Sequence, residues 1–194
     1  FAYYRNMSVE DYGVCDSLNH YQLQTYAWGQ FALRSGAYSN VAVNQFHISC
    51  SQNTEDPPEI FGTEVARRDD TYANLFTIDI DGDNDKDVII GDSQANNSLL
   101  VINGGTNVAA DMVAQDTAFP SYDVPVQLRS FTSHAYVDAD HDGKRDLLVG
   151  NSEFETKRGV LYYKNTNTDA APVFQFQFNG FLQNEMIDVA ADIY

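Results

Sequence analysis

Basic residues, cysteines and long apolar runs are all scarce in this chain. Only 11 of its 194 residues are Lys or Arg, against 28 that are Asp or Glu, so the formal net charge is −17. A surface of this charge repels nucleic acid and anionic lipid, and no Lys/Arg cluster offsets the repulsion. No stretch approaches the roughly 20 consecutive apolar residues that cross a membrane. We therefore expect neither nucleic-acid binding nor direct membrane insertion.

The few cysteines and the first residues bear on the cellular compartment. Cys15 and Cys50 are compatible with one disulfide that closes a long loop in an oxidising compartment, and two buried free thiols are the alternative. The first ten residues lack the basic start and apolar stretch of a signal peptide, and the first residue is not Met. We expect a mature or internal fragment. Asn-x-Ser sequons at Asn6 and Asn96 are possible glycosylation sites.

Strand signals dominate the chain. Apolar and polar residues alternate over 21–27 and 40–49, as in half-buried strands. The run APVFQFQF places Phe174, Phe176 and Phe178 at strand spacing, which predicts that all three face the core. Helix signals are thin, since only 107–115 and 181–191 could form a turn or two, and neither has capping residues at both ends. The expected fold class is all-β.

An internal repeat begins after residue 70. ANLFTIDIDGDNDKDVIIGDS aligns with SHAYVDADHDGKRDLLVGNS, so that Asp79 matches Asp138 at an offset of 59. Each unit reads as strand, acidic loop, strand, polar turn and strand, followed by a further extended segment. Three or four short antiparallel strands in such a unit are typical of a β-propeller blade.

The repeat predicts the domain organisation. We expect an N-terminal β-rich segment at 1–70, a first repeat at 71–129, and a second at 130–194 that stops before a third acidic loop. Two units cannot close a propeller, which typically needs 4 to 8 blades. Either the early residues supply a degenerate blade or an insertion, or the protein continues beyond the residues given.

Each acidic loop spans nine positions, 79–87 in the first unit and 138–146 in the second. Carboxylates so close together repel one another unless a cation lies among them. Hard oxygen ligands at positions 1, 3, 5 and 9, with a backbone carbonyl at position 7, suit Ca²⁺, whereas softer metals prefer His or Cys. We therefore predict about two Ca²⁺ ions. The candidate ligands are Asp79, Asp81, Asp83, Asp85 and Asp87 in the first loop, and Asp138, Asp140, Asp142, Lys144 and Asp146 in the second.

Two details sharpen this prediction. Position 6 is Asn84 in one loop and Gly143 in the other, the residue types that best tolerate a left-handed backbone. An EF-hand would need a Glu at position 12 and flanking helices, but position 12 is Ile90 or Val149 within an apolar strand. A single acidic loop could be a solvated turn, whereas two loops in matched context favour a metal.

One stretch invites an enzymatic interpretation. Gly91-Asp92-Ser93 is similar to an esterase motif, and Asp138-x-x-His141 is similar to a second element of those enzymes. The repeat accounts for both, because Gly91 aligns with Gly150 at a strand end and His141 lies inside an acidic loop. Such hydrolases also need alternating helices and strands. We expect a protein that is not an enzyme.

The loop pattern D-x-D-x-D-G/N-x-x-D-[VL]-[IL]-[IV]-G resembles the FG-GAP and VCBS repeat families, whose blades also form the head of integrin α subunits. The segments DYGVC, QDTAFPSYDVPV, GVLYYKNT, APVFQF and FLQNEMIDV look like repeat proteins of Bacteroidetes, which are secreted or surface-displayed, commonly through the type 9 secretion system. The resemblance covers most of the chain after residue 70 and parts of the first 15 residues. It implies a partial or complete calcium-binding β-propeller at an extracellular or outer-surface location.

The same resemblance implies a function. By this resemblance, the chain is expected to be a non-catalytic module for adhesion or for recognition of a protein or glycan. Its other expected partners are further blades of the same longer chain and type 9 secretion components. The alternatives are an accessory domain of a larger secreted enzyme, or a secretion substrate captured with its export machinery. Asp-Ser/Thr-apolar triplets at Ser17 and Thr117 would be O-glycosylation sites in such organisms.

Overall fold

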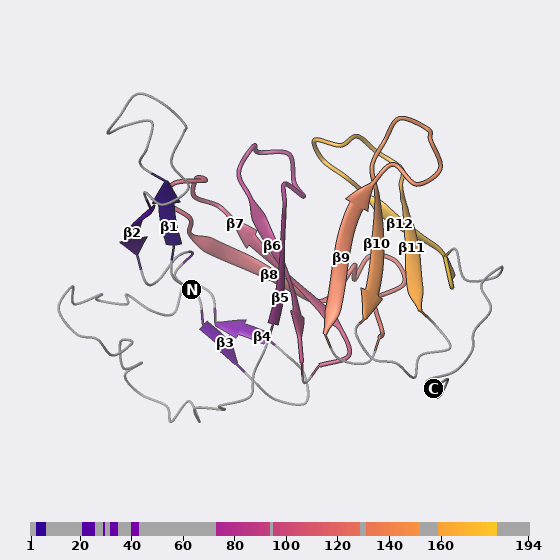
Figure 1. Cartoon of the computed structure of the whole chain (residues 1–194), viewed down its shortest axis with the longest axis horizontal. Helices are drawn as coiled ribbons and strands as arrows, with labels where there is room; N and C mark the ends of the chain where they lie inside the picture. Colours follow the sequence, from indigo (N-terminus) through magenta and orange to yellow (C-terminus); the bar gives the residue numbers. More distant parts are fainter. Residues whose placement is uncertain are drawn as a thin grey trace, which may run out of the picture.

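The structure is a computed structural model that describes residues 3–6, 21–25, 29, 32–34, 40–42, 73–93, 95–128, 131–151 and 159–181 (Figure 1). The described residues are all-β, as expected. None of them forms a helix long and apolar enough to cross a membrane. Cys15, Cys50 and Ser17 lie outside the described residues, as does most of the possible helical turn at 181–191.

Two four-stranded antiparallel sheets dominate the fold, and their strands follow one another in chain order. The first sheet contains β5 (Ala73–Ile78), β6 (Asp87–Asp92), β7 (Ser98–Asn103) and β8 (Met112–Phe119). The second contains β9 (Thr132–Val137), β10 (Asp146–Asn151), β11 (Val160–Asn165) and β12 (Phe174–Asn179). Neither sheet closes on itself, and the described strands do not complete a propeller ring.

Two short hairpins precede these sheets. The first pairs β1 (Tyr3–Asn6) with β2 (Tyr21–Thr25), and the second pairs β3 (Ala32–Arg34) with β4 (Asn40–Ala42). An isolated bridge joins Gly29 to Asp111, immediately before β8, and the amide of Met112 donates to the carbonyl of Gly29 at 2.9 Å. This part of the chain therefore contacts the first large sheet.

The possible helical turn at 107–115 is wrong. Residues 107–109 lie in the turn after β7, and β8 begins at Met112. The amides of Gly105 and Asp111 both donate to Oδ1 of Asn103, at 3.1 and 2.9 Å. Because this side chain closes the turn, the following residues pair with β7 and do not coil.

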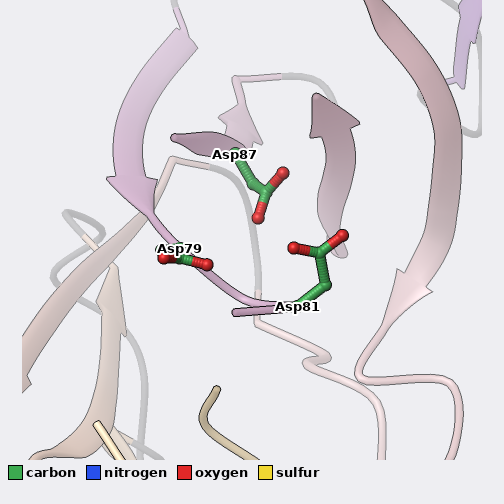
Figure 2. Close-up of side chains that lie close together, drawn as sticks. All are labelled: Asp79, Asp81 and Asp87. Carbon is green, nitrogen blue, oxygen red and sulfur yellow. The ribbon is translucent and has the colours of Figure 1, made fainter. Parts of the chain in front are cut away.

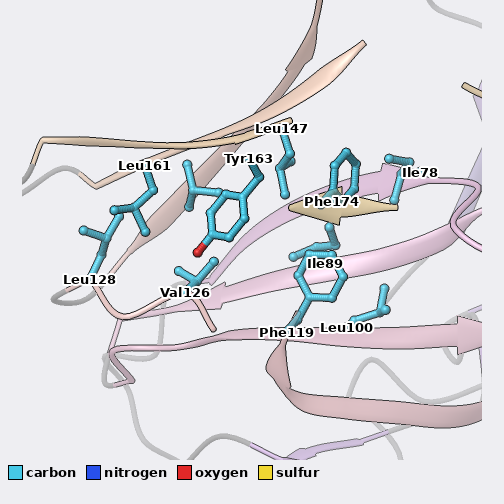
Figure 3. Packing of buried hydrophobic residues seen from close by; sticks show 11 residues of the cluster. Ile78, Ile89, Leu100, Phe119, Val126, Leu128, Leu147, Leu161, Tyr163 and Phe174 are labelled. Carbon is cyan, nitrogen blue, oxygen red and sulfur yellow. The ribbon is translucent and has the colours of Figure 1, made fainter. Parts of the chain in front are cut away.

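The main hydrophobic core lies between the two large sheets (Figure 3). Phe119 from β8 and Phe174 from β12 meet edge to face, with their ring centroids 6.3 Å apart. Tyr136 from β9 meets the same Phe174 ring edge to face at 5.9 Å. The buried members of this core are Ile78, Ile89, Leu100, Phe119, Val126, Leu128, Leu147, Val149, Leu161, Tyr163 and Phe174. Since both sheets contribute, each sheet stabilises the other through burial of apolar surface.

A β-bulge in the last hairpin changes the predicted packing of β12. The register shifts between Tyr162 and Tyr163, so Phe176 pairs with Tyr163 and Phe178 pairs with Tyr162. Tyr162 and Tyr163 are neighbours in β11 and point to opposite faces of the sheet, so their partners Phe178 and Phe176 do so as well. Phe174 and Phe176 therefore face the core, but Phe178 lies on the other face with 42% of its surface exposed. The prediction that Phe178 faces the core is wrong.

Hydrogen bonds to backbone carbonyls join the two sheets at one end of β6. The amide of Phe131 donates to the carbonyl of Asp92 at 3.1 Å, and the side-chain amide of Asn74 donates to the carbonyl of Thr132 at 3.3 Å. A Cβ added to Gly91 would lie 2.1 Å from that Thr132 oxygen. The first sheet can approach β9 this closely because residue 91 has no side chain.

Candidate metal centres

Each acidic loop closes the first hairpin of its sheet. Ile78 pairs with Asp87 and Val137 pairs with Asp146, so both loops start at the last residue pair of the hairpin. The two loops therefore occupy the same place in two sheets of the same strand order.

The ninth residue of each loop is fully buried and anchored by backbone amides. Asp87 accepts hydrogen bonds from the amides of Ile80 and Asn103, both at 2.8 Å. Asp146 is held in the same way, by the amides of Ala139 at 3.2 Å and Asn165 at 2.8 Å. These bonds tie each loop to the third strand of its sheet.

Three aspartates converge in each loop. Oxygen atoms of Asp79, Asp81 and Asp87 lie within 4.8 Å of one another, as Figure 2 shows for the first loop. The equivalent group in the second loop contains Asp138, Asp140 and Asp146. Two oxygens bound to one Ca²⁺ at about 2.3 to 2.6 Å are at most about 5 Å apart, so both groups fit one hard cation. The structure thus brings together the predicted ligands at positions 1, 3 and 9.

The predicted residues at positions 5 and 7 lie outside these two groups of oxygens. Oδ1 of Asp83 accepts a hydrogen bond from the amide of Asp85, and Oδ1 of Asp142 accepts one from the amide of Lys144, each at 2.9 Å. The side chains at position 5 therefore brace the loop backbone at the point where position 7 follows.

Left-handed residues shape both loops. Asn84 and Gly143 have φ angles of 73° and 87°, which confirms the prediction for position 6. Position 4 is left-handed as well, with φ of 86° at Gly82 and 61° at His141, and the sequence pattern did not reveal this. These turns allow the carboxylate at position 1 to accept two amides, from Gly82 and Asn84 in the first loop.

The first loop holds a carboxylate that lacks any partner among the described residues. Asp85 is only 5% exposed, and neither of its carboxylate oxygens accepts a hydrogen bond. Burial, followed by the charges of Asp83, Asp81 and Asp79, raises the pKa of Asp85. A buried charge is costly unless it is paired, so a cation bound in this loop would stabilise the ionised side chain.

Asp87, at the buried end of the first loop, also has a raised pKa. Burial raises the pKa of Asp87 to about 6, although its bonds to the amides of Ile80 and Asn103 oppose the shift. A divalent ion beside this carboxylate would favour the charged form and lower that pKa. The donor set therefore fits a hard cation such as Ca²⁺.

Cationic side chains lie in and beside the second loop. The ammonium group of Lys164 in β11 contacts the carboxylate of Asp140 and lies 2.9 Å from that of Asp142. Arg145 donates to Asp169 through its amide at 2.7 Å and through Nε at 2.9 Å, and its guanidinium lies 4.4 Å from the centre of the Tyr136 ring. Lys164 lowers the pKa of Asp142 through its hydrogen bond.

Sequence reasoning missed Asn103 and Asn165, which end β7 and β11. The amide of each binds the buried aspartate of its loop, and the side chain of each closes the turn that follows. The available signal was the Asn at the end of both aligned strands, SLLVIN and VLYYKN. Lys164 gave no such signal, because the first unit has Ile102 in its place.

The remaining predicted modification sites are exposed where the structure describes their side chains. Thr117 is exposed on β8, and Asn96 is exposed in the turn between β6 and β7. Comparisons with protein-family models, with curated proteins and with solved structures found no match for this chain.

Proposed function

We propose that this chain is a non-catalytic, calcium-binding β-module of a secreted or cell-surface protein. Its two large sheets would be two blades of an FG-GAP/VCBS-type propeller, with other blades of the same protein beside them. In this proposal each acidic loop binds one Ca²⁺ ion, and the ion holds together the first and third strands that meet at the loop.

The observation that carries the proposal is the buried carboxylate of Asp85, which has no hydrogen-bond partner among the described residues. It lies beside a group of three further aspartates whose oxygens are close enough to share one ion. Without a cation the loop would bury repelling charges, and with one the same groups would become stabilising ligands.

Calcium is favoured over other metals by the ligands. All the candidate side-chain donors are carboxylate oxygens, which suit hard cations, whereas zinc and copper sites favour His and Cys. Ca²⁺ accepts six to eight oxygens in flexible geometry, and Mg²⁺ requires a nearly ideal octahedron. Extracellular calcium modules bind at about 10⁻⁴ to 10⁻³ M, which agrees with a location outside the cell, where calcium is abundant.

The biological role rests on the resemblance of the acidic loops to FG-GAP and VCBS repeats. That resemblance supports adhesion, or recognition of a protein or glycan, by a rigid surface that calcium stabilises. Export by the type 9 secretion system rests on the same resemblance. Fold-level analogy supports these steps.

Calorimetric titration of the metal-free chain with Ca²⁺, compared with Mg²⁺, tests the calcium proposal. We expect binding of about two Ca²⁺ ions with dissociation constants of about 10⁻⁴ to 10⁻³ M, weaker Mg²⁺ binding, and a higher melting temperature with Ca²⁺ than in EDTA. An identical melting temperature in EDTA and in about 10 mM Ca²⁺, which is roughly tenfold above the weakest expected dissociation constant, together with no binding heat, would overturn it.

A further inference from the structure

The hydrogen bonds establish which residues of the two sheets are equivalent around the acidic loops. The amide of Asn103 donates to Asp87, and the amide of Asn165 donates to Asp146, each at 2.8 Å. Asn103 and Asn165 therefore occupy the same position. The residue before each is Ile102 in the first sheet and Lys164 in the second.

This difference between Ile102 and Lys164 makes the surroundings of the second loop less negatively charged than those of the first. Residues 79–87 contain five Asp and one Lys, a formal charge of −4, whereas residues 138–146 contain four Asp, one Lys and one Arg, a formal charge of −2. Lys164 then adds a positive charge in direct contact with Asp140 and Asp142. Among the described residues, no Lys or Arg side chain forms an ion pair with an aspartate of the first loop.

The residue at position 7 also makes the first loop more negatively charged than the second. Position 7 is Asp85 in the first loop, buried and without a partner, and Lys144 in the second. The first loop thus offers an extra negative charge where the second offers a positive one. A divalent ion is attracted more strongly to the first loop, by Coulomb's law at similar separations.

Building on the proposed calcium function, we propose that the two sites are unequal and fill in order. The first loop is the primary calcium site, and the ammonium group of Lys164 is a tethered competitor for the second. A Ca²⁺ ion enters the second loop only when Lys164 leaves Asp140 and Asp142. The first sheet is then held by metal at low calcium, and the second is held by its own lysine until calcium rises.

The partly exposed position of Lys164 makes this exchange feasible. About a third of the side-chain surface is exposed for Lys164, Asp140 and Asp142, at 34%, 33% and 30%. Water screens an ion pair that is exposed to this extent, so the pair stabilises the fold only weakly and a divalent ion can displace the lysine. The long, flexible lysine side chain can move into solvent without unfolding β11.

The experiment follows the backbone amides of Gly82 and Gly143 by NMR during a Ca²⁺ titration of the metal-free chain. These glycines lie in the first and second loop and report each site separately. The test variant is K164M, which removes the ammonium group and keeps the chain length. K164R retains the charge, and K144M removes a charge from the second loop that makes no ion pair within the described residues.

In the wild-type protein we expect the Gly82 amide to respond at lower Ca²⁺ than the Gly143 amide. K164M should lower the Gly143 midpoint by up to about fivefold and leave the Gly82 midpoint unchanged, because the ammonium group no longer competes for Asp140 and Asp142. K164R should behave as wild type, and K144M should change the Gly143 midpoint less than K164M does.

The failures of the two proposals are distinguishable. If both amides respond at the same Ca²⁺ concentration and K164M changes neither midpoint, the inequality is wrong and the calcium function stands. An equal effect of K144M and K164M would show that net charge suffices, and would overturn the role of the Lys164 contact. If neither amide responds in any variant, calcium binding itself is wrong.

Discussion

Oγ of Ser98 in β7 lies 2.8 Å from Nε2 of His134 in β9, and this side-chain hydrogen bond joins the two sheets. Ser98 is fully buried, and its hydroxyl also lies 3.1 Å from Oγ1 of Thr132. The other imidazole nitrogen, Nδ1, is buried with no hydrogen-bond partner among the described residues. A proton added to this ring would place an uncompensated charge at the contact between the sheets.

This pair predicts a pH dependence of stability. Burial lowers the pKa of His134 from 6.5 to about 4, so the imidazole is neutral in the folded protein. The unfolded chain takes up the proton near pH 6.5 and the folded chain only near pH 4, so stability is lost as the pH falls from 6.5 towards 4. In EDTA, His134 should account for a loss of about 2 kcal/mol between pH 7 and pH 5.

Denaturant unfolding of the wild type and of H134Q at both pH values measures this loss. Gln keeps polar atoms at the site but cannot titrate, so its loss between pH 7 and pH 5 should be smaller by about that amount. Equal losses in the two proteins would show that another group controls the acid sensitivity.

The two glycines at the ends of β6 and β10 predict a contrast in stability. A Cβ at Gly91 would lie 2.1 Å from the carbonyl oxygen of Thr132, whereas the nearest atom to a Cβ at Gly150 is 3.9 Å away. G91A should therefore destabilise the protein by about 2 kcal/mol or more, because the sheets must separate. G150A should change stability by less than about 0.5 kcal/mol. Thermal melting of both variants in the same buffer measures the difference, and equal melting temperatures would contradict this contact.

Asp85 predicts a mutation whose effect changes sign with calcium. In EDTA, D85N should stabilise the protein by about 1 kcal/mol, because it removes one of several repelling charges from a buried position. With saturating Ca²⁺ the same variant should be less stable than wild type, because a charge near the ion is lost. Denaturant unfolding with and without Ca²⁺ checks both signs. D83N is not a matched control, since Asp83 also binds the amide of Asp85.

A glycine pair tests the contact between the first acidic loop and the second sheet. Gly82 and Gly143 are both left-handed, so an Ala at either position costs about 1 kcal/mol. A Cβ at Gly82 would also lie 3.0 Å from Cβ of Ala171 in the β11–β12 turn, whereas a Cβ at Gly143 has no neighbour within 4 Å. G82A should therefore lower the melting temperature more than G143A does, and the opposite order would argue against this contact.

The strands and both loops could be predicted from the sequence because their signals are local. The aspartate spacing and the following apolar run locate each loop before a buried strand, and Asn84 and Gly143 point to the left-handed turn. The partner of the second loop could not be found in this way. Lys164 lies 24 residues after Asp140, and only the pairing of β10 with β11 brings its side chain to the loop.

The packing of β12 escaped prediction for a different reason. Alternation assigns Phe178 to the core only if the strand is regular, and the bulge opposite Tyr162 and Tyr163 breaks that regularity. A bulge depends on how two strands fit together, so the sequence of one strand does not reveal it. The left-handed residue at position 4 was missed because glycine marks it in the first loop only, and the second loop has His141 there, which adopts this conformation less readily than glycine.

The two loops adopt one backbone shape with glycine at different places, Gly82 at position 4 in the first and Gly143 at position 6 in the second. Asn84 and His141 supply the remaining left-handed residues. A search pattern that demands glycine at one fixed column would retrieve only one of these loops. A pattern that allows Gly, Asn or His at both columns, within a frame of aspartates at positions 1, 3 and 9, would retrieve both, and would also detect diverged copies in other chains.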